Sequence, residues 1–282
     1  MENKFTDICT FEVLYKAYLA ARRGKRSRAA TAHYEVHLLE NIVNLVYILT
    51  TKTYRPGVFR VFYVYEPKKR LVQAPAFVDK VVQHAVVDNI LYERITNSFI
   101  LDNYASQKNK GLHFGLDRLK GFLTDYWNKN HTADGWVLKC DVRHFFASID
   151  HDRLKEKLKK LDLEPALYDL LCVYIDCSDG LPLGYQTSQL FALHYLDEFD
   201  HFVKEKLHIR YYGRYMDDFF LTRTKNICSI ASRKYRHLWH LLVWNSMRKH
   251  RFSRLDMGWT FLVFTPTSRT TARSSASCGT AA

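Results

Sequence analysis

Residues 209–221 read IRYYGRYMDDFFL, and they place two adjacent carboxylates, Asp217 and Asp218, inside an apolar and aromatic stretch. The flanking residues predict two short strands, with the aspartates at the tip of the hairpin between them. A carboxylate among apolar side chains is costly unless a cation or hydrogen bonds compensate it. The pair is therefore either ordinary turn chemistry or part of a metal site.

A second short apolar strand also ends on an acid. Residues 135–141 read GWVLKCD, which places Asp141 at the end of the predicted strand. If this strand and the hairpin are neighbours in one sheet, three carboxylates meet at one sheet edge. Such oxygen ligands suit Mg²⁺, and two ions about 4 Å apart can hold the attacking and leaving oxygens of an in-line phosphoryl transfer.

The rest of the chain predicts a mixture of helices and short antiparallel hairpins. Strands are expected over residues 58–67 and 70–75, joined at a basic tip. Helices are expected over 8–22, 33–50, 77–96, 152–161, 166–175 and 188–207, with one more that ends near Trp127. This order predicts an α+β fold, with no internal repeat before residue 222.

Composition narrows the class of protein. The chain has 282 residues, of which 47% are hydrophobic and 15% aromatic, so a large folded core is expected. No apolar run reaches the roughly 18 residues of a membrane span, and the N-terminus lacks a signal-peptide core, so we expect a cytoplasmic protein without a membrane partner. The six cysteines are scattered without a CxxC pair, which favours reduced thiols over a disulfide framework or a zinc site.

The formal net charge of +13 is typical of a nucleic-acid-binding protein, but it is unevenly distributed. Residues 222–282 hold 11 Lys and Arg and one acid, whereas residues 1–221 hold 31 basic and 28 acidic side chains. Most of the basic excess therefore belongs to the C-terminal tail.

The order of several motifs resembles one enzyme family. YMDD at 215–218, preceded by CDVRHFFASID at 140–150 and LGYQTSQ at 183–189, resembles the palm of reverse transcriptases. Upstream, PKKRLVQAPAFVDKVVQHAV resembles their fingers motif, and YASQKNKGLHFG resembles the segment that follows it. The resemblance covers about residues 55–221. It implies a right-hand polymerase with fingers and an antiparallel palm sheet flanked by helices.

The resemblance also implies roles for individual residues. Asp141, Asp217 and Asp218 correspond to the catalytic triad, and with Val142 they form the expected site for two Mg²⁺ ions. Phe146, five residues past Asp141, occupies the steric-gate position, where a ring excludes a 2′-hydroxyl. The alternative for Phe146 is core packing, which is also expected of its neighbour Phe145.

Further residues are implied in nucleotide binding: Lys68, Lys69, Arg70, Phe146, Gly184, Ser188 and Gln189. The basic tip would neutralise a triphosphate, or it is simply a solvated hairpin end. Gly184 would let the backbone approach the incoming base pair. Ser188 with Gln189 would open the next helix, although Ser188 also fits an ordinary helix N-cap.

Basic side chains outside the motifs are candidates for nucleic-acid contacts. The candidates are Arg22, Arg23, Lys25, Arg26, Lys108 and Lys110. The first four belong to the link ARRGKRSR, for which a solvated loop is the equal alternative.

The implied function is RNA-directed DNA polymerisation on an RNA template, with a DNA primer and dNTPs. Leu183 and Gln189 stand where many reverse transcriptases have Gln and Pro, and this variant resembles the enzymes of bacterial diversity-generating retroelements. An accessory retroelement protein would then be a partner. The alternatives are group II intron, retron or phage-defence reverse transcriptases, or a catalytically dead nucleic-acid-binding remnant.

The chain divides into four expected regions: an N-terminal helical region (1–54), fingers (55–135), palm (136–221) and an aberrant tail (222–282). The tail shows neither the hairpin nor the helical thumb that the family implies. Trp259 must be TGG and Thr260 ACN, so a frame starting at the third base of the Trp codon reads Asp. Allowed codons for 258–267 then permit VDFLGFHTY, which contains the family's FLG, and 225–228 permit Glu-Tyr-Leu at the same offset. We interpret the tail as out of frame, with a slip near Thr222.

Overall fold

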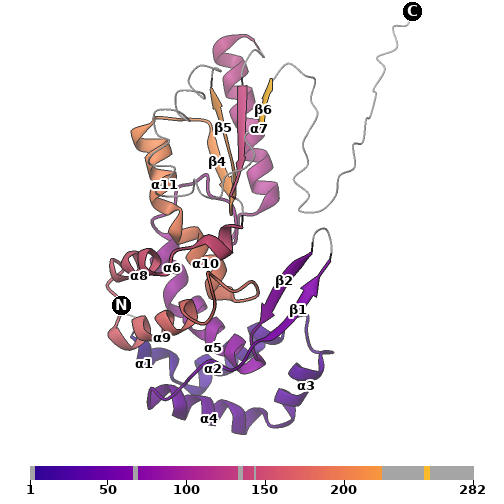
Figure 1. Ribbon diagram of the computed structural model, residues 1–282, viewed down its shortest axis with the longest axis vertical. Helices are drawn as coiled ribbons and strands as arrows, with labels where there is room; N and C mark the ends of the chain where they lie inside the picture. The colour runs from indigo at the N-terminus through magenta and orange to yellow at the C-terminus, as the bar shows by residue number, and fades with distance from the viewer. Residues whose placement is uncertain (1–3, 66–68, 133–135, 143, 224–250, 255–282) are drawn as a thin grey trace, which may run out of the picture.

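The computed structural model describes residues 4–65, 69–132, 136–142, 144–223 and 251–254. Within them the chain forms helices and two antiparallel sheets, which confirms the α+β prediction. Figure 1 shows an elongated molecule with helices at one end, the larger sheet at the other, and the small β1–β2 ribbon projecting between them.

Four helices form the N-terminal region: α1 (Phe5–Ile8), α2 (Phe11–Arg22), α3 (Ala29–Val36) and α4 (Leu38–Thr50). The two helices expected here are each divided in two. Thr10 interrupts the first, because its hydroxyl accepts a hydrogen bond from the backbone N–H of Val13 and caps α2. His37 separates α3 from α4 with a non-helical backbone. The apolar period continues through both breaks, so periodicity alone did not reveal them.

A long helix packs against this region and joins it to the rest of the molecule. It consists of α5 (Phe77–Val86), a wider π-type turn η1 (Val87–Leu91) and α6 (Tyr92–Thr96), which together match the predicted helix 77–96. Its residues Val81, Val82, Ala85 and Val86 are fully buried, and α5 packs along α2. Before it, β1 (Arg60–Val64) pairs with β2 (Arg70–Ala74), as predicted for the first hairpin.

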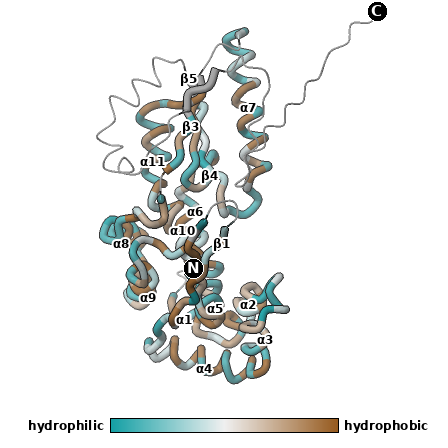
Figure 2. Tube along the Cα trace, turned by 45° about the vertical axis from the view of Figure 1, so that its right-hand side comes forward, coloured by the Kyte–Doolittle hydropathy of each residue, from teal (hydrophilic) through white to brown (hydrophobic). Residues whose placement is uncertain are grey.

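Of the remaining helices, some flank the larger sheet and others lie between it and the N-terminal helices (Figure 1). They are α7 (Leu112–Asn130), the short 3₁₀ turn η2 (Phe145–Ser148), α8 (His151–Lys159), α9 (Pro165–Ile175), α10 (Gln186–Tyr195), α11 (Asp197–His201) and the π-type turn η3 (Phe202–Lys206). The predicted helix 188–207 therefore begins two residues earlier and is interrupted at Leu196. Bands of apolar and polar residues follow one another along α4 and α7 (Figure 2). None of the described helices is long and apolar enough to cross a membrane.

The larger sheet has the strand order β4-β5-β3-β6, and all its pairs are antiparallel. Its strands are β3 (Trp136–Asp141), β4 (Tyr212–Tyr215), β5 (Asp218–Arg223) and β6 (Arg251–Arg254). Because side chains alternate along a strand, Phe219 and Leu221 enter the main core with Phe199 of α11, while Phe220 packs with Phe122 of α7 on the opposite face. The sheet is thus covered on both faces.

Two features of the sheet differ from the expected palm boundary at residue 221. Strand β5 continues through Thr222 to Arg223, and Arg251–Arg254 pair with β3. A tail read out of frame would be expected to pack little against residues 1–221, and this expectation is wrong for these two segments. For 224–250 and 255–282 the expectation lies outside the described residues.

Candidate active site

The Asp217–Asp218 pair lies at the tip of a tight hairpin, as predicted. Strands β4 and β5 close with Tyr215 directly opposite Asp218, which leaves Met216 and Asp217 as the turn. Met216 has a positive φ of 57°, an unfavourable conformation for an unbranched side chain without a local hydrogen-bonding group. The turn therefore needs support from its surroundings.

The sheet brings the third predicted carboxylate to the same end. Strand β3 pairs with β5 so that Asp141 stands directly opposite Asp218. Residues opposite each other in an antiparallel pair point to the same face, so Asp141 does not lie on the far side of the sheet. The three carboxylates come from two segments about 75 residues apart, and the strand register alone unites them.

The electrostatics at this sheet end reflect crowded negative charge. Partial burial raises the pKa of Asp218 above its usual range, and the neighbouring Asp141 raises it further. The Lys139 ammonium, 3.6 Å from an Asp218 carboxylate oxygen, acts in the opposite direction. Lys139 was missed in the sequence, although its place two residues before Asp141 on one strand face is a usable signal.

The donor set fits a hard divalent cation. Two facing carboxylates and a third in the adjoining turn supply only oxygen ligands, and their mutual repulsion favours a bound cation. Among the described residues, no group of three or more His, Cys, Asp or Glu side chains already stands at metal-ligand spacing. The fit therefore rests on the chemistry and placement of these three side chains.

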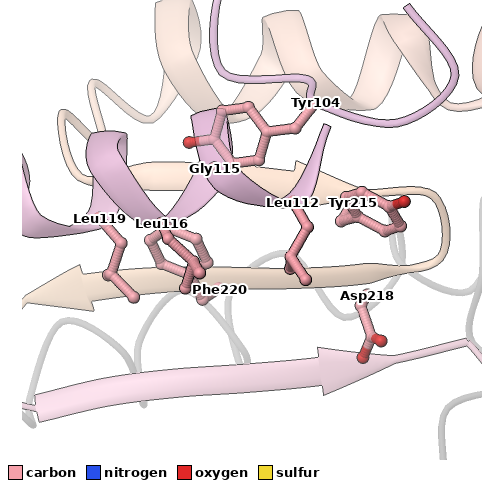
Figure 3. Close-up of a pocket in the computed structure, with 8 residues that line it drawn as sticks. All are labelled: Tyr104, Leu112, Gly115, Leu116, Leu119, Tyr215, Asp218 and Phe220. Atoms are coloured by element: carbon pink, nitrogen blue, oxygen red, sulfur yellow. The ribbon is translucent and has the colours of Figure 1, made fainter. Parts of the chain in front are cut away.

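A small apolar pocket lies beside the turn between β4 and β5. Its lining residues are Tyr104, Leu112, Gly115, Leu116, Leu119, Tyr215, Asp218 and Phe220. Figure 3 shows α7 resting over the β4–β5 hairpin, with Asp218 directed toward β3. This apolar surrounding is the source of the burial that raises the pKa of Asp218.

Phe146, the predicted steric gate, lies in the short turn η2 that follows β3. Its ring is half-buried and meets the fully buried Phe145 edge-on, with ring centroids 5.7 Å apart. Its carbonyl accepts a 2.7 Å hydrogen bond from the backbone N–H of Leu181. The structure confirms the core position of Phe145 and leaves one side of Phe146 accessible.

The loop before α10 contacts the ribbon instead of an open cleft. The backbone N–H of Gln73 on β2 donates to the carbonyl of Leu183 at 3.1 Å. Gly184 has φ 120°, and a Cβ there would lie 2.9 Å from the carbonyl oxygen of Gln73. The close approach that requires this glycine is therefore to β2, whereas an approach to a base pair was predicted.

Ser188 and Gln189 differ in exposure. The helix begins at Gln186 with Tyr185 as its N-cap, so the alternative of Ser188 as an N-cap is wrong. Ser188 is buried, which favours a packing role in the first turn of α10. Gln189 is exposed and accepts a 3.2 Å hydrogen bond from the hydroxyl of Ser106.

The basic tip of the ribbon is partly described. Lys69 places its ammonium 4.3 Å from the centre of the Tyr63 ring, in a cation–π contact on an exposed ribbon. Lys68 and the side chain of Arg70 lie outside the described residues. Among the described side chains, the tip thus offers one cation, Lys69, and Arg60 at the other end of β1 is a further exposed cation on the ribbon.

Some of the other residues predicted to contact nucleic acid already have partners within the protein, and others are exposed. Arg22 pairs with Glu35 at 3.3 Å, and the exposed Arg26 lies 3.6 Å from the same carboxylate. Lys110 donates to the carbonyls of Leu101 and Asn103, both at 3.0 Å, so its ammonium secures a loop.

The remaining candidate residues are accessible to a bound nucleic acid. Arg23 and Lys108 are exposed, and Lys25 is partly exposed. Lys80 on α5, which the sequence did not single out, adds a cation near this basic link, because Lys25 and Arg28 help burial to lower its pKa.

Comparison with known proteins places these features in one family. Residues 66–248 match the family described as "Reverse transcriptase (RNA-dependent DNA polymerase)". Protein YkfC of Escherichia coli (strain K12) is 27% identical over 159 residues, which are 51% of this chain and 40% of that protein. The chain thus spans less than half the length of this curated relative.

Solved structures share the fold at low sequence identity. The truncated apo telomerase of Candida tropicalis matches with a TM-score of 0.52 and 12% identity, over 77% of this chain and 56% of that one. Telomerase of Candida albicans, solved with a fragment of telomeric RNA, matches with a TM-score of 0.53 and 10% identity, over 74% of this chain and 44% of that one. At such identities the likeness concerns the fold.

Proposed function

The chain belongs to the reverse transcriptase family, and from this premise we propose that it is an RNA-directed DNA polymerase that adds dNTPs to a primer 3′ end. The observation that carries the proposal is the strand register that sets Asp141 opposite Asp218, beside the Asp217 turn. The alternative of simple turn chemistry explains two adjacent aspartates but gives no reason for a third on the neighbouring strand.

In this proposal the three aspartates hold two Mg²⁺ ions, which supply charge stabilisation at the attacking and leaving oxygens. Asp141 and Asp218 contribute from facing strands, and Asp217 contributes from the turn between β4 and β5. Lys139 balances part of the negative charge from the same strand as Asp141. Val142, next to Asp141, is buried and fixes the end of β3 in the core.

The nucleotide is proposed to bind between the sheet end and the ribbon. Lys69, with Lys68 and Arg70 beside it, would meet the triphosphate, because phosphoryl transfer requires cations at the phosphate oxygens. Phe146 would contact the sugar from η2, which begins four residues past Asp141. Gly184 would let the backbone approach the incoming base pair, and its close approach to Gln73 also seats the ribbon against this loop.

The partners are an RNA template and a DNA primer, held in part by exposed cations such as Arg23, Lys25 and Lys108. The residues Leu183 and Gln189 favour a bacterial diversity-generating retroelement, which acts in the cytoplasm with an accessory protein. Neighbouring genes test this finer assignment: a variable repeat with a template copy supports it, whereas an intron RNA or a defence cluster contradicts it.

Primer extension on a defined RNA template tests the main proposal. In a protein with the frame restored near Thr222, Asp217→Asn is expected to abolish extension while the unfolding midpoint stays near that of the unsubstituted protein, because the change removes a ligand and no core volume. Asp117→Asn is the matched control, since Asp117 is an exposed acid on α7 and the charge change is the same. Extension that persists in Asp217→Asn would refute the two-metal assignment.

A further inference from the structure

A fully buried arginine lies directly behind the catalytic turn. Arg214 is on β4, two residues before Met216, and its side chain is 0% exposed. Asp200 on α11, its ionic partner, is also 0% exposed. The sequence drew attention to the carboxylates after Arg214 and not to Arg214 itself.

The guanidinium of Arg214 connects the turn to the helical layer. Its Nε and one Nη donate to the two carboxylate oxygens of Asp200 at 2.7 and 2.6 Å, in a bidentate pair. Its other Nη donates to the carbonyl oxygen of Met216 at 2.8 Å. The Tyr212 hydroxyl also donates to Asp200, which fixes that carboxylate from a second direction.

The main chain of Arg214 is held as firmly as its side chain. Its N–H donates to the carbonyl of Asp102 and its carbonyl accepts from the N–H of Tyr104, both at 2.9 Å. Strand β4 is therefore bonded on both of its edges, to β5 and to the segment around Asn103. The Arg214 guanidinium therefore connects this fixed strand to the turn, through its hydrogen bond to the Met216 carbonyl.

The point of contact is the strained residue of the turn. Met216 has a φ of 57°, and a non-glycine residue keeps such a conformation only where its surroundings enforce it. Its carbonyl group begins the peptide unit that leads to Asp217. Holding this carbonyl therefore fixes the direction in which Asp217 leaves the turn.

A buried ion pair is a costly way to stabilise a fold. Removing two charges from water consumes much of their attraction, and well-packed apolar replacements are often as stable. The pair therefore needs an explanation other than stability. The bond to the Met216 carbonyl supplies one, because no apolar side chain can make it.

We propose that Arg214 and Asp200 are positioning residues that set the Met216–Asp217 turn in its metal-binding conformation. The structural part of this inference stands on the contacts alone, and its consequence for metal binding rests on the proposed polymerase function. Neither residue need touch substrate. Arg214 acts through the Met216 carbonyl, and Asp200 acts by orienting Arg214.

The test separates positioning from stability by removing both charges together. In the full chain, Arg214→Met combined with Asp200→Leu leaves no uncompensated buried charge, although the Tyr212 hydroxyl loses its acceptor, so the unfolding midpoint is expected to fall modestly and the protein to stay folded. Hydrogen–deuterium exchange is then followed by mass spectrometry. Peptides containing Met216–Asp218 are expected to exchange at least about tenfold faster, while peptides from α5 and α9 remain unchanged.

Two outcomes would overturn the positioning role: unchanged exchange at the turn, or faster exchange by one common factor across the whole chain. Arg214→Lys serves as a second variant that keeps the charge beside Asp200 but lacks the planar fork. It is expected to show the same local increase. This variant decides the question if the double variant does not fold.

Metal binding provides a readout that a purely structural role would not move. Mn²⁺ alone, titrated by electron paramagnetic resonance, is expected to bind the double variant about 10- to 100-fold more weakly than the unsubstituted chain. Equal affinity, with faster exchange at the turn, would refute the link to metal. If the unsubstituted chain binds no Mn²⁺, the proposed function fails, and the exchange data alone decide the positioning role.

Discussion

At the scale of single residues, Phe146 and Phe145 form a matched pair of neighbouring rings with different surroundings. Phe146 is half-buried at the surface of η2, whereas Phe145 is in the core. In a protein with the frame restored, Phe146→Ala is expected to admit ribonucleotides more readily, because the ring that would contact the 2′-hydroxyl is gone. The measurement is the ratio of dNTP to rNTP incorporation.

The neighbouring ring provides the control for this prediction. Phe145→Ala is expected to cost about 3–5 kcal/mol of unfolding free energy without relaxing sugar selection. An unchanged ratio in Phe146→Ala would assign Phe146 to packing only.

His194 on α10 predicts a pH dependence of stability. Burial lowers its pKa from 6.5 to about 4, and the ammonium groups of Lys157 and Lys160 act in the same direction, whereas Glu198 opposes them. The His194 imidazole is therefore protonated near pH 6.5 in the unfolded chain but only near pH 4 in the folded chain. Stability is lost as the pH falls through this interval, by up to roughly 3 kcal/mol.

Urea unfolding at pH 7 and pH 5 checks this prediction. His194→Leu is expected to lose less stability between the two pH values than the unsubstituted chain. His113→Leu, at an exposed position on α7, is expected to behave as the unsubstituted chain does. Equal pH dependence in all three proteins would show that His194 does not contribute.

Single residues also show where sequence reasoning stops. Strand alternation and motif order identified Asp141, Asp217 and Asp218, because each lies at a strand end that the pattern predicts. Lys139 and Arg214 were missed, since their importance comes from partners across the sheet and in α11. An arginine in an aromatic strand is a signal of a buried ion pair, but the sequence does not name its partner.

At the scale of elements, the contact between the ribbon and the loop before α10 is expected to be sensitive to one methyl group. In Gly184→Ala the new Cβ would lie 2.9 Å from the Gln73 carbonyl oxygen, and the backbone φ of 120° is unfavourable for alanine. β2 must then move away, and Lys69 and Arg70 move with it. We expect the KM for dNTPs to rise, with some loss of stability.

A second glycine provides the control. Gly121 lies within α7 with no atom near its missing Cβ, so Gly121→Ala is expected to raise stability by up to about 1 kcal/mol and leave the KM unchanged. If the KM for dNTPs is unaffected in Gly184→Ala, the ribbon and the loop are not coupled.

The sequence predicted which segments form helices and strands better than it predicted where each of them begins and ends. Helix 77–96 and both hairpins were predicted from periodicity and turn residues, and the structure contains them. The breaks at Thr10, His37 and Leu196 were not predicted, because apolar spacing continues across each of them. Strand β6 could not have been predicted, since RFSR has little apolar content and owes its strand to pairing with β3.

At the scale of the whole molecule, the out-of-frame interpretation of residues 222–282 stays a prediction. Two findings run against a break at Thr222: β5 continues to Arg223, and the family match extends to residue 248. The nucleotide sequence across codons 215–230 decides it. A single-base slip there is expected, and restoring the frame should yield an FLG-containing hairpin, a helical thumb and stronger primer extension than the chain as written. An uninterrupted frame in an active gene would refute it.

The overall architecture followed from motif order, whereas the arrangement of its parts did not. Five motifs in one sequence order implied fingers and palm, and the strand order β4-β5-β3 joins the motifs as that architecture requires. The contact of Gly184 with β2 and the second covered face of the sheet depend on packing between segments far apart in the chain. Neither has a local signature in the sequence.

The exposed β1–β2 ribbon is expected to affect the solubility of the protein at high concentration. All five residues of β1 are exposed, among them Phe62 and Tyr63, and within the part of the chain that the structure describes the ribbon consists of two strands. A strand edge of this composition is a template for pairing with the same edge of another copy, and natural proteins limit such pairing with charged neighbours. Here that restraint comes from the basic tip, so anions that neutralise Lys69 and Arg70 without covering the strand would promote precipitation.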